Sequence, residues 1–208
     1  MYKSTKSLLA VMAMALCASA AQASTPNLIS NGDFESTTLG SINGFKVANA
    51  GANAITGWTI GGVSVDVING AYGAISGNSI DLLGTPGPGS LSQSFNTIVG
   101  HNYLVSFGLS ANGGSGDSKS MTVSVGNNAL FNYLGEVNKI TNQSFLYTAN
   151  YSGLTALTFT SAASGYSGAV IDNVSVMAAV PEPSTYAMML GGLGLVGFMT
   201  RRRKSTVV

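Results

Sequence analysis

The sequence predicts an all-β protein, a jelly-roll β-sandwich, and two observations indicate this fold. Between residues 27 and 177, short runs of alternating apolar and polar residues are separated by Gly, Asn, Ser and Pro, as in strands joined by turns. These runs recur about every 8–12 residues, a spacing typical of sandwiches and jelly rolls. A sustained helical pattern is found only at the two ends of the chain.

The strands are predicted in chain order, without an internal repeat. They are expected at 55–60, 63–68, 79–83, 91–95, 103–109, 120–125, 143–148, 155–160 and 169–177. The segment 84–90 (GTPGPGS) is expected to be a surface turn, because strand-like runs continue on both sides of it. The sequence therefore predicts one β-sandwich domain over residues 24–179, flanked by targeting segments at 1–23 and 180–208.

The distribution of charge excludes nucleic acid as a partner. Only 8% of the 208 residues are charged, against about 25% in an average soluble protein. Six of the nine cations lie at the two ends, which leaves three lysines and seven acids between them and a net charge of −4 in the domain. An acidic domain lacks the basic surface that binds phosphate backbones.

The first 23 residues are predicted to be a secretory signal peptide. Lys3 and Lys6 precede an apolar run at 8–18, and small residues lead up to Ala23. We expect signal peptidase to cut after Ala23. Cys17 would leave with the peptide, so that the mature domain would have no disulfide, thiolate metal site or cysteine nucleophile.

The C-terminal segment is predicted to be a sorting signal. Pro181, Glu182 and Pro183 precede an apolar stretch from Tyr186 to Thr200, and a basic cluster follows it (Arg201, Arg202, Arg203 and Lys204). This order resembles the PEP-CTERM sorting signal, also described as an ice-binding-protein-like C-terminal motif. The resemblance implies a Gram-negative bacterium and transient anchoring by a transmembrane helix in the inner membrane. It further implies removal of the helix by an exosortase that recognises the Pro-Glu-Pro box; a plain tail anchor is the alternative.

Ordered blocks in the middle of the chain carry a second resemblance. They are 27–35 (NLISNGDFE), 57–58 (GW), 79–82 (SIDL), 91–95 (LSQSF), 100–103 (GHNY) and 171–174 (IDNV). In this order they resemble the choice-of-anchor C family, which is related to a plant cell-wall domain of unknown function. The resemblance implies a galactose-binding-like jelly roll.

The sequence lacks the combinations of catalytic side chains that an enzyme needs, so no catalytic residue is predicted. His101 is the only histidine, and its Gly-His-Asn setting predicts an exposed turn. Glycosidases need two facing carboxylates, and Asp66 and Asp81 are the only pair on neighbouring predicted strands. Their positions in the alternating pattern place both on solvated faces.

Sugar binding needs aromatic platforms together with polar groups. Trp58 and Tyr103 share strand faces with apolar residues and are expected in the core. Tyr72 and Tyr166 are instead flanked by glycines in loops, so they are the candidates for stacking on a sugar ring. A loop tyrosine that packs on its own loop is the alternative interpretation.

A structural calcium ion is a further expectation. The alternating pattern places Asp172 on the same face as Val170 and Val174, where a carboxylate must be paired or bound to a metal. Asp33 and Glu35 flank Phe34 in the opening segment, and the first and last strands of a jelly roll commonly lie side by side. The resemblance implies that Glu35 and Asp172 hold the ion, and the position of Asp33 beside Phe34 makes it a candidate for a third ligand. Hydrogen bonds from backbone N–H groups to Asp172 are the alternative.

These expectations combine into a secreted, exosortase-sorted surface or matrix protein with a non-catalytic β-sandwich. One hypothesis is that the sandwich binds carbohydrate in the exopolysaccharide around the cell. The alternative is a structural matrix protein with no specific ligand, in which the sorting signal decides the location.

Overall fold

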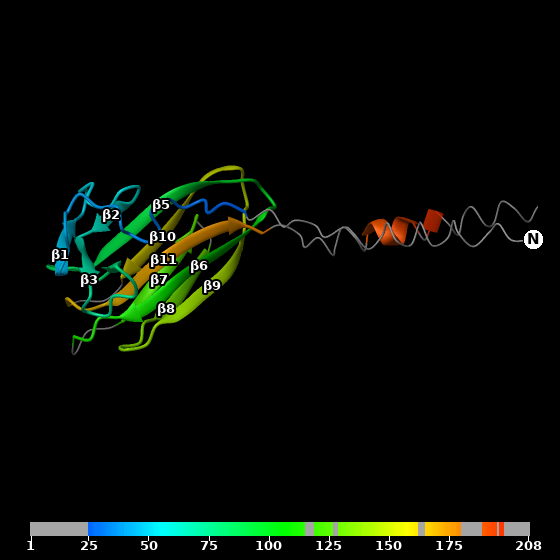
Figure 1. Ribbon diagram of the computed structural model, residues 1–208. Helices are drawn as coiled ribbons and strands as arrows, with labels where there is room; N and C mark the ends of the chain where they lie inside the picture. Colours follow the sequence, from blue (N-terminus) through cyan, green and yellow to red (C-terminus); the bar gives the residue numbers. More distant parts are fainter. Residues whose placement is uncertain are drawn as a thin grey trace, which may run out of the picture. The chain divides into compact units, whose positions relative to one another are not determined.

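The computed structural model describes residues 25–114, 119–126, 129–161, 165–179, 189–194 and 196–197. Within them, eleven strands form two antiparallel sheets that face each other (Figure 1). This arrangement confirms the predicted all-β sandwich. Pro26–Ala179 forms a compact unit of its own.

The first sheet has six strands, in the order β1-β3-β4-β11-β6-β9. Their bounds are β1 (Gly44–Asn49), β3 (Ser64–Asn69), β4 (Asn78–Asp81), β11 (Ala169–Ala178), β6 (Asn102–Ala111) and β9 (Thr141–Thr148). The second sheet has five strands, in the order β2-β5-β10-β7-β8. Their bounds are β2 (Thr59–Gly62), β5 (Gly89–Thr97), β10 (Gly153–Ser161), β7 (Ser120–Val125) and β8 (Ala129–Leu134).

The hydrophobic core lies between the two sheets, where every second residue of most strands points inward. Phe34, Trp58, Phe159 and Phe107 form a continuous chain of ring contacts across it, with centroids 5.2–6.4 Å apart. The indole Nε1–H of Trp58 donates to the carbonyl of Asn31 at 2.9 Å, so this buried ring also has its polar group satisfied. Trp58 and Tyr103 are both core residues, as predicted.

Most of the predicted strands are confirmed to within two residues at each boundary. The run 55–60 is correct only at its last two residues, since β2 begins at Thr59 and Ile55 makes an isolated bridge to Thr37. Sequence analysis missed β1 and β8. Both are edge strands of their sheets, and an edge strand pairs on one side only, so its burial pattern is a weaker signal.

A β-bulge in β11 corrects the predicted orientation of Asp172. The pairing of β11 with β6 shifts between Asp172 and Ser175, and Asn173 there has a φ of 52°. Val170 lies opposite Asp81 on the outward face, so Asp172 points outward too, whereas Val174 beyond the bulge points into the core. The expectation that Asp172 shares a face with Val174 is therefore wrong, because the bulge interrupts the alternation.

At the C-terminal end, residues 189–194 and 196–197 are helical. Within the described part of the chain, no helix has the length and apolar character needed to cross a membrane. The predicted cleavage site at Ala23 lies outside the described residues, as do Pro181, Glu182, Pro183, Arg201, Arg202 and Arg203.

Candidate functional site

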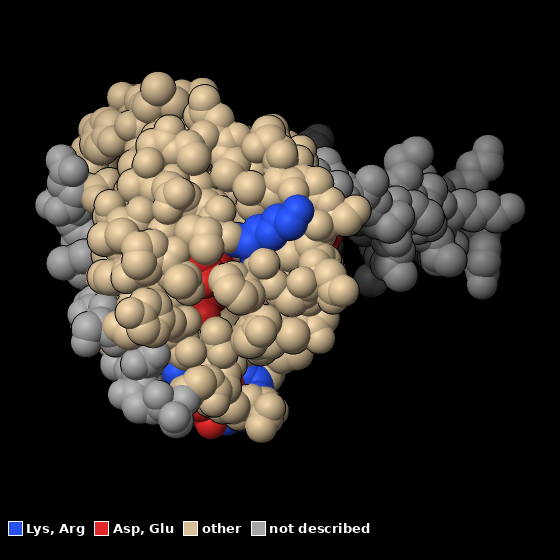
Figure 2. Space-filling model, turned by 90° about the vertical axis from the view of Figure 1, so that its left-hand side faces the viewer, with Lys and Arg blue, Asp and Glu red and all other residues tan. Residues whose placement is uncertain are grey.

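A pocket of about 550 Å³ opens on the outward side of the six-stranded sheet, at the end of the sandwich where β11 begins. Five loops and the strands β1 and β3 converge on it. Figure 2 views this end and shows a small patch of acidic atoms with a basic side chain directly beside it, in a surface that is otherwise mostly uncharged. The polar and aromatic residues that line the pocket are Phe45, Asp66, Tyr72, Thr85, Asn112, Asn138, Tyr166 and Ser167.

The carboxylate of Asp66 lies in the lining of the pocket, and Asp81 lies beside it. The two residues are directly opposite each other in the pairing of β3 with β4, so their side chains lie on the same outward face. That face agrees with the prediction, but the expected solvation is wrong. Asp66 is only 4% exposed and Asp81 is not exposed at all, because the loops after β4 and β10 cover this part of the sheet.

The hydrogen bonds of Asp66 and Asp81 show how the loops cover them. Asp66 accepts bonds from the backbone N–H and the hydroxyl of Thr85, at 3.1 and 3.0 Å. Asp81 accepts backbone bonds from Leu83 and Gly168, both at 3.0 Å, and a 2.8 Å bond from the Asn112 amide. Together the two aspartates therefore fix three loops around the pocket, those that follow β4, β6 and β10.

Burial shifts the titration of both carboxyl groups. It raises the pKa of Asp66, against the hydrogen bonds from Thr85 that lower it. Burial also raises the pKa of Asp81 to about 7. The bond from Asn112 opposes this rise, and the neighbouring charge of Asp66 adds to it. At neutral pH the pair thus carries less negative charge than two ionised carboxylates would.

Tyr72 and Tyr166 both line this pocket, although 94 positions separate them in the sequence. Tyr72 lies in the loop between β3 and β4 and is 46% exposed, and Tyr166 lies in the loop between β10 and β11 and is 60% exposed. The ring of Tyr72 meets that of Phe45 edge-on, with centroids 5.6 Å apart. The structure thus brings together the two tyrosines that the sequence singled out.

The position of Tyr72 depends on a close backbone contact between its loop and the end of β6. The next residue, Gly73, has a φ of 84°, and a Cβ atom there would lie 2.3 Å from the carbonyl oxygen of Ala111. Only glycine fits this contact. The hydroxyl of Ser110, next to Ala111 on β6, donates to the carbonyl of Gly73 and fixes the same loop.

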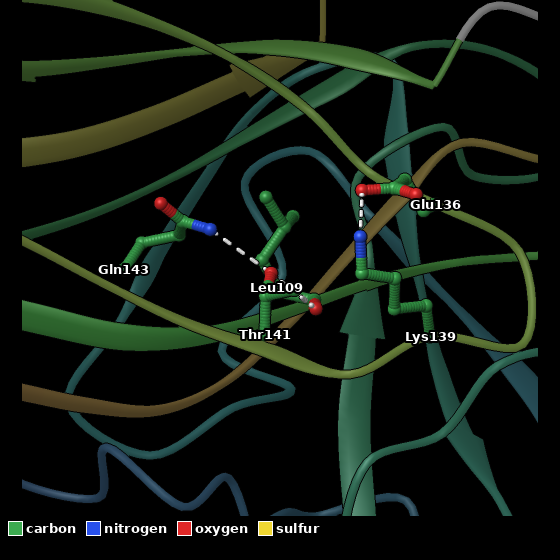
Figure 3. A network of polar contacts seen from close by, with 5 residues as sticks. All are labelled: Leu109, Glu136, Lys139, Thr141 and Gln143. Atoms are coloured by element: carbon green, nitrogen blue, oxygen red, sulfur yellow. Dashed lines mark hydrogen bonds and ion pairs between the residues drawn. The ribbon is translucent and has the colours of Figure 1, made fainter.

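The turn between β8 and β9 forms another part of the rim, which the sequence did not reveal. Val137 and Asn138 line the pocket. Around them, Lys139 forms a 2.6 Å ion pair with Glu136, as Figure 3 shows. At the start of β9, the hydroxyl of Thr141 donates to the carbonyl of Leu109 on β6 at 3.3 Å.

Lys119 joins two of these loops, those that carry Asn112 and Tyr166. Its ammonium group donates to the carbonyls of Gly114, at 3.0 Å, and Ser167, at 2.6 Å. Both acceptors lie in the lining of the pocket. The loop that carries Tyr166 is thus held by an amine on one side and by Asp81 on the other.

The predicted calcium ligands are only partly brought together. Asp172 is buried and accepts bonds from the backbone N–H of Ser76 (3.1 Å) and Asn173 (2.6 Å) and from the Ser79 hydroxyl (3.3 Å). Burial raises its pKa to about 6, and the nearby charge of Glu35 adds to the rise. Glu35 itself accepts a 2.7 Å bond from the backbone N–H of Asn78.

Asp33 is exposed and lines a separate groove beside Asn173 and Val174. Among the residues that the structure describes, no group of three or more His, Cys, Asp or Glu side chains is placed to hold a metal. Two carboxylates and the backbone around them supply hard oxygen donors of the kind that Ca²⁺ binds. The calcium ion stays a prediction.

Comparison with known proteins identifies the domain. A family model described as "Protein of unknown function (DUF642)" matches residues 27–177. The chain belongs to the DUF642 family. A second model, the PEP-CTERM protein-sorting motif, matches residues 179–204. This motif marks exported proteins that are anchored at the membrane and processed by an exosortase to reach the cell surface.

The DUF642 domain is also similar to part of a curated protein, Halomucin from Haloquadratum walsbyi (strain DSM 16790 / HBSQ001). The two are 29% identical over 161 residues, which cover 74% of this chain and 2% of Halomucin. The chain thus spans only a small fraction of that protein's length.

Among solved structures, the DUF642 chain is similar to a family 4 carbohydrate-binding module, with a TM-score of 0.44 and 16% identity over 73% of this chain and 99% of the module. A second is TmCBM61 in complex with β-1,4-galactotriose, with a TM-score of 0.40 and 15% identity over 74% and 100% of the two chains. A third is a putative sugar-binding protein from Bacteroides thetaiotaomicron VPI-5482, with a TM-score of 0.39 and 13% identity over 74% and 100%.

Proposed function

We propose that this DUF642 protein is a surface or extracellular-matrix protein whose β-sandwich binds carbohydrate in the pocket between Tyr72 and Tyr166. The observation that supports this most strongly is the meeting of these two tyrosines, from separate loops, at one cavity with a carboxylate in its lining. The ligand we propose is the exopolysaccharide of the producing cell, which the protein would meet after its sorting.

The lining of the pocket matches the chemistry of a sugar ring. The C–H faces of sugars pack on aromatic rings, and three rings, those of Phe45, Tyr72 and Tyr166, line this pocket. Sugar hydroxyls need hydrogen-bond acceptors. Each oxygen of Asp66 accepts one bond from Thr85, and a carboxylate oxygen has room for a second.

The same geometry favours binding over hydrolysis. A glycosidase places two carboxylates against its substrate. Of the described residues that line this pocket, Asp66 is the only acid, and Asp81 beside it is fully buried with its bonds directed to the protein. The pocket therefore presents one carboxylate, which suits an acceptor for hydroxyl groups.

Affinity electrophoresis tests the proposal. The purified protein is run through native gels with and without exopolysaccharide from the producing organism. We expect the polysaccharide to retard the protein relative to a non-binding standard. Migration that is equal in both gels would contradict carbohydrate binding and would favour the structural matrix protein with no specific ligand.

A further inference from the structure

The exposed large apolar side chains of the DUF642 domain fall mainly into two groups at opposite ends of the sandwich. One group forms the rim of the pocket. The other lies in residues 96–104 and 146–154, which we call the apolar end. It comprises Ile98, Val99, Leu104, Leu146, Tyr151 and Leu154, each exposed by about a third to two thirds of its surface.

Hydrogen bonds hold the two stretches of the apolar end against each other. The backbone N–H of Val99 donates to the Ser152 hydroxyl, and the hydroxyl of Thr97 donates to the carbonyls of Tyr151 and Gly153. On the neighbouring sheet, Leu104 of β6 lies directly opposite Leu146 of β9. The two stretches of the apolar end contain no Lys, Arg, Asp or Glu, and His101 is their only histidine.

The chain leaves the domain at this same end. The backbone N–H of Ala179, just after β11, donates to the carbonyl of Asn102 at 2.8 Å, and Figure 1 shows β11 ending beside the loops of the apolar end. Residues 180–185 separate Ala179 from the apolar stretch of the sorting motif. Six residues span at most about 20 Å, so an anchored chain keeps the apolar end within that distance of the bilayer.

We propose that the apolar end inserts into the interfacial layer of the bilayer while the sorting motif anchors the chain. Exposed leucine, isoleucine, valine and tyrosine side chains bind such interfaces. The lack of charged side chains in this surface removes a cost of insertion. Tethering raises the local concentration of the bilayer around this surface, so a small apolar area is enough.

This inference has a consequence for the pocket. The pocket lies near Ala169 at the start of β11, and the apolar end lies near Ala178 at its finish. Ten residues of strand separate them by about 30 Å. Insertion of the apolar end would therefore hold the pocket away from the membrane. The inference rests on anchoring by the sorting motif, and it does not depend on what the pocket binds.

The test uses the full chain in phosphatidylcholine vesicles, with Cys17→Ser as the background so that one new cysteine carries an NBD fluorophore. Asn150→Cys places the label in the apolar end, and Ala71→Cys places it in an exposed loop near the pocket. We expect lipids with a nitroxide near the headgroup to quench the label at residue 150 by at least twofold and to leave the label at residue 71 unquenched.

A matched pair of substitutions separates insertion from mere proximity. Leu154→Ser removes an apolar side chain that is 68% exposed at the apolar end, and Leu134→Ser removes one that is 66% exposed at the other end of the sandwich. We expect only Leu154→Ser, combined with Val99→Ser, to reduce the quenching, with unchanged thermal melts. Equal quenching in all variants, no quenching at residue 150, or a chain that fails to float with the vesicles would overturn the inference.

Discussion

Asp66 and Asp81 lie directly opposite each other on the adjacent strands β3 and β4, and both are buried beneath the loops that form the pocket. Two carboxylates on neighbouring strands repel each other when both are ionised. Their hydrogen bonds hold three of the surrounding loops, at Thr85, Asn112 and Gly168. The protonation state of these two aspartates therefore affects both the stability of the domain and the loops that shape the pocket.

The raised pKa of Asp81 predicts that the domain loses stability as the pH rises through about 7. Its ordinary value is 3.8 and its value in the folded protein is about 7. Between these values the folded protein holds a proton that the unfolded chain has released. The stabilisation is therefore complete below about pH 4 and decreases by up to about 1.4 kcal/mol per pH unit.

Thermal melts of the wild type and Asp81→Asn between pH 4.5 and 8 check this prediction. The wild-type melting temperature is expected to fall over this range, and Asp81→Asn is expected to flatten the fall. Lys139→Ala, which breaks only the exposed ion pair with Glu136, serves as the control and should keep the wild-type slope. A slope in Asp81→Asn as steep as in the wild type would contradict the assignment.

Asp66 is predicted to contribute to ligand binding through its acceptor oxygens. Asp66→Asn keeps one acceptor and its approximate shape but removes the charge, so we expect the affinity for exopolysaccharide to fall about tenfold, as for the loss of one hydrogen bond to a charged group. Affinity electrophoresis at several polysaccharide concentrations measures this change. An unchanged affinity in a variant that still folds would show that Asp66 does not contact the sugar.

The calcium prediction is tested by thermal melts in excess chelator and in millimolar Ca²⁺. An ion held by Glu35 and Asp172 would bind only the folded state and would raise the melting temperature. Glu35→Gln is expected to abolish the shift, and Asp33→Asn, in the separate groove, is expected to keep it. If the wild-type melts coincide with and without calcium, the ion does not bind, and the hydrogen bonds to Asp172 alone account for its burial.

The Pro-Glu-Pro box is predicted to control release from the membrane. Replacement of Pro181, Glu182 and Pro183 by alanine should leave the protein in the inner-membrane fraction, because the exosortase would no longer recognise the tail. Immunoblots of cell fractions measure the outcome. Ser184→Ala, immediately beyond the box, is the control and should be released like the wild type. Release of the alanine variant at the wild-type level would contradict the prediction.

The sequence was sufficient for features that local pattern determines. Alternation placed the inner strands correctly, and the glycines around Tyr72 and Tyr166 correctly predicted exposed loops. It failed at Asp172, because Asn173 adopts a left-handed conformation that interrupts the alternation; Asn is one of the few residues that tolerate it. An Asp-Asn pair inside an apolar strand is the signal that could have revealed this bulge.

The remaining features depend on contacts between distant segments. Asp66 and Asp81 have the alternation of solvated residues, and only the loops at Thr85 and Gly168 bury them. Likewise, no local pattern shows that Val137 from the β8–β9 turn lines the same pocket as Tyr72. The composition of the pocket therefore could not be predicted from a single sequence, even though both of its tyrosines were.

The most direct test of carbohydrate binding in the pocket compares two variants by affinity electrophoresis in gels with exopolysaccharide. One is the double variant Tyr72→Ala/Tyr166→Ala, and the other is the matched control Tyr151→Ala. Tyr151 is also an exposed loop tyrosine, 40% exposed, but it lies at the far end of the sandwich from the pocket. Each stacked ring contributes about 0.5–1.5 kcal/mol to binding. We therefore expect the double variant to lose roughly 5- to 150-fold in affinity. Tyr151→Ala is expected to be retarded like the wild type. Equal retardation of all three proteins would contradict the assignment of the pocket as the carbohydrate site.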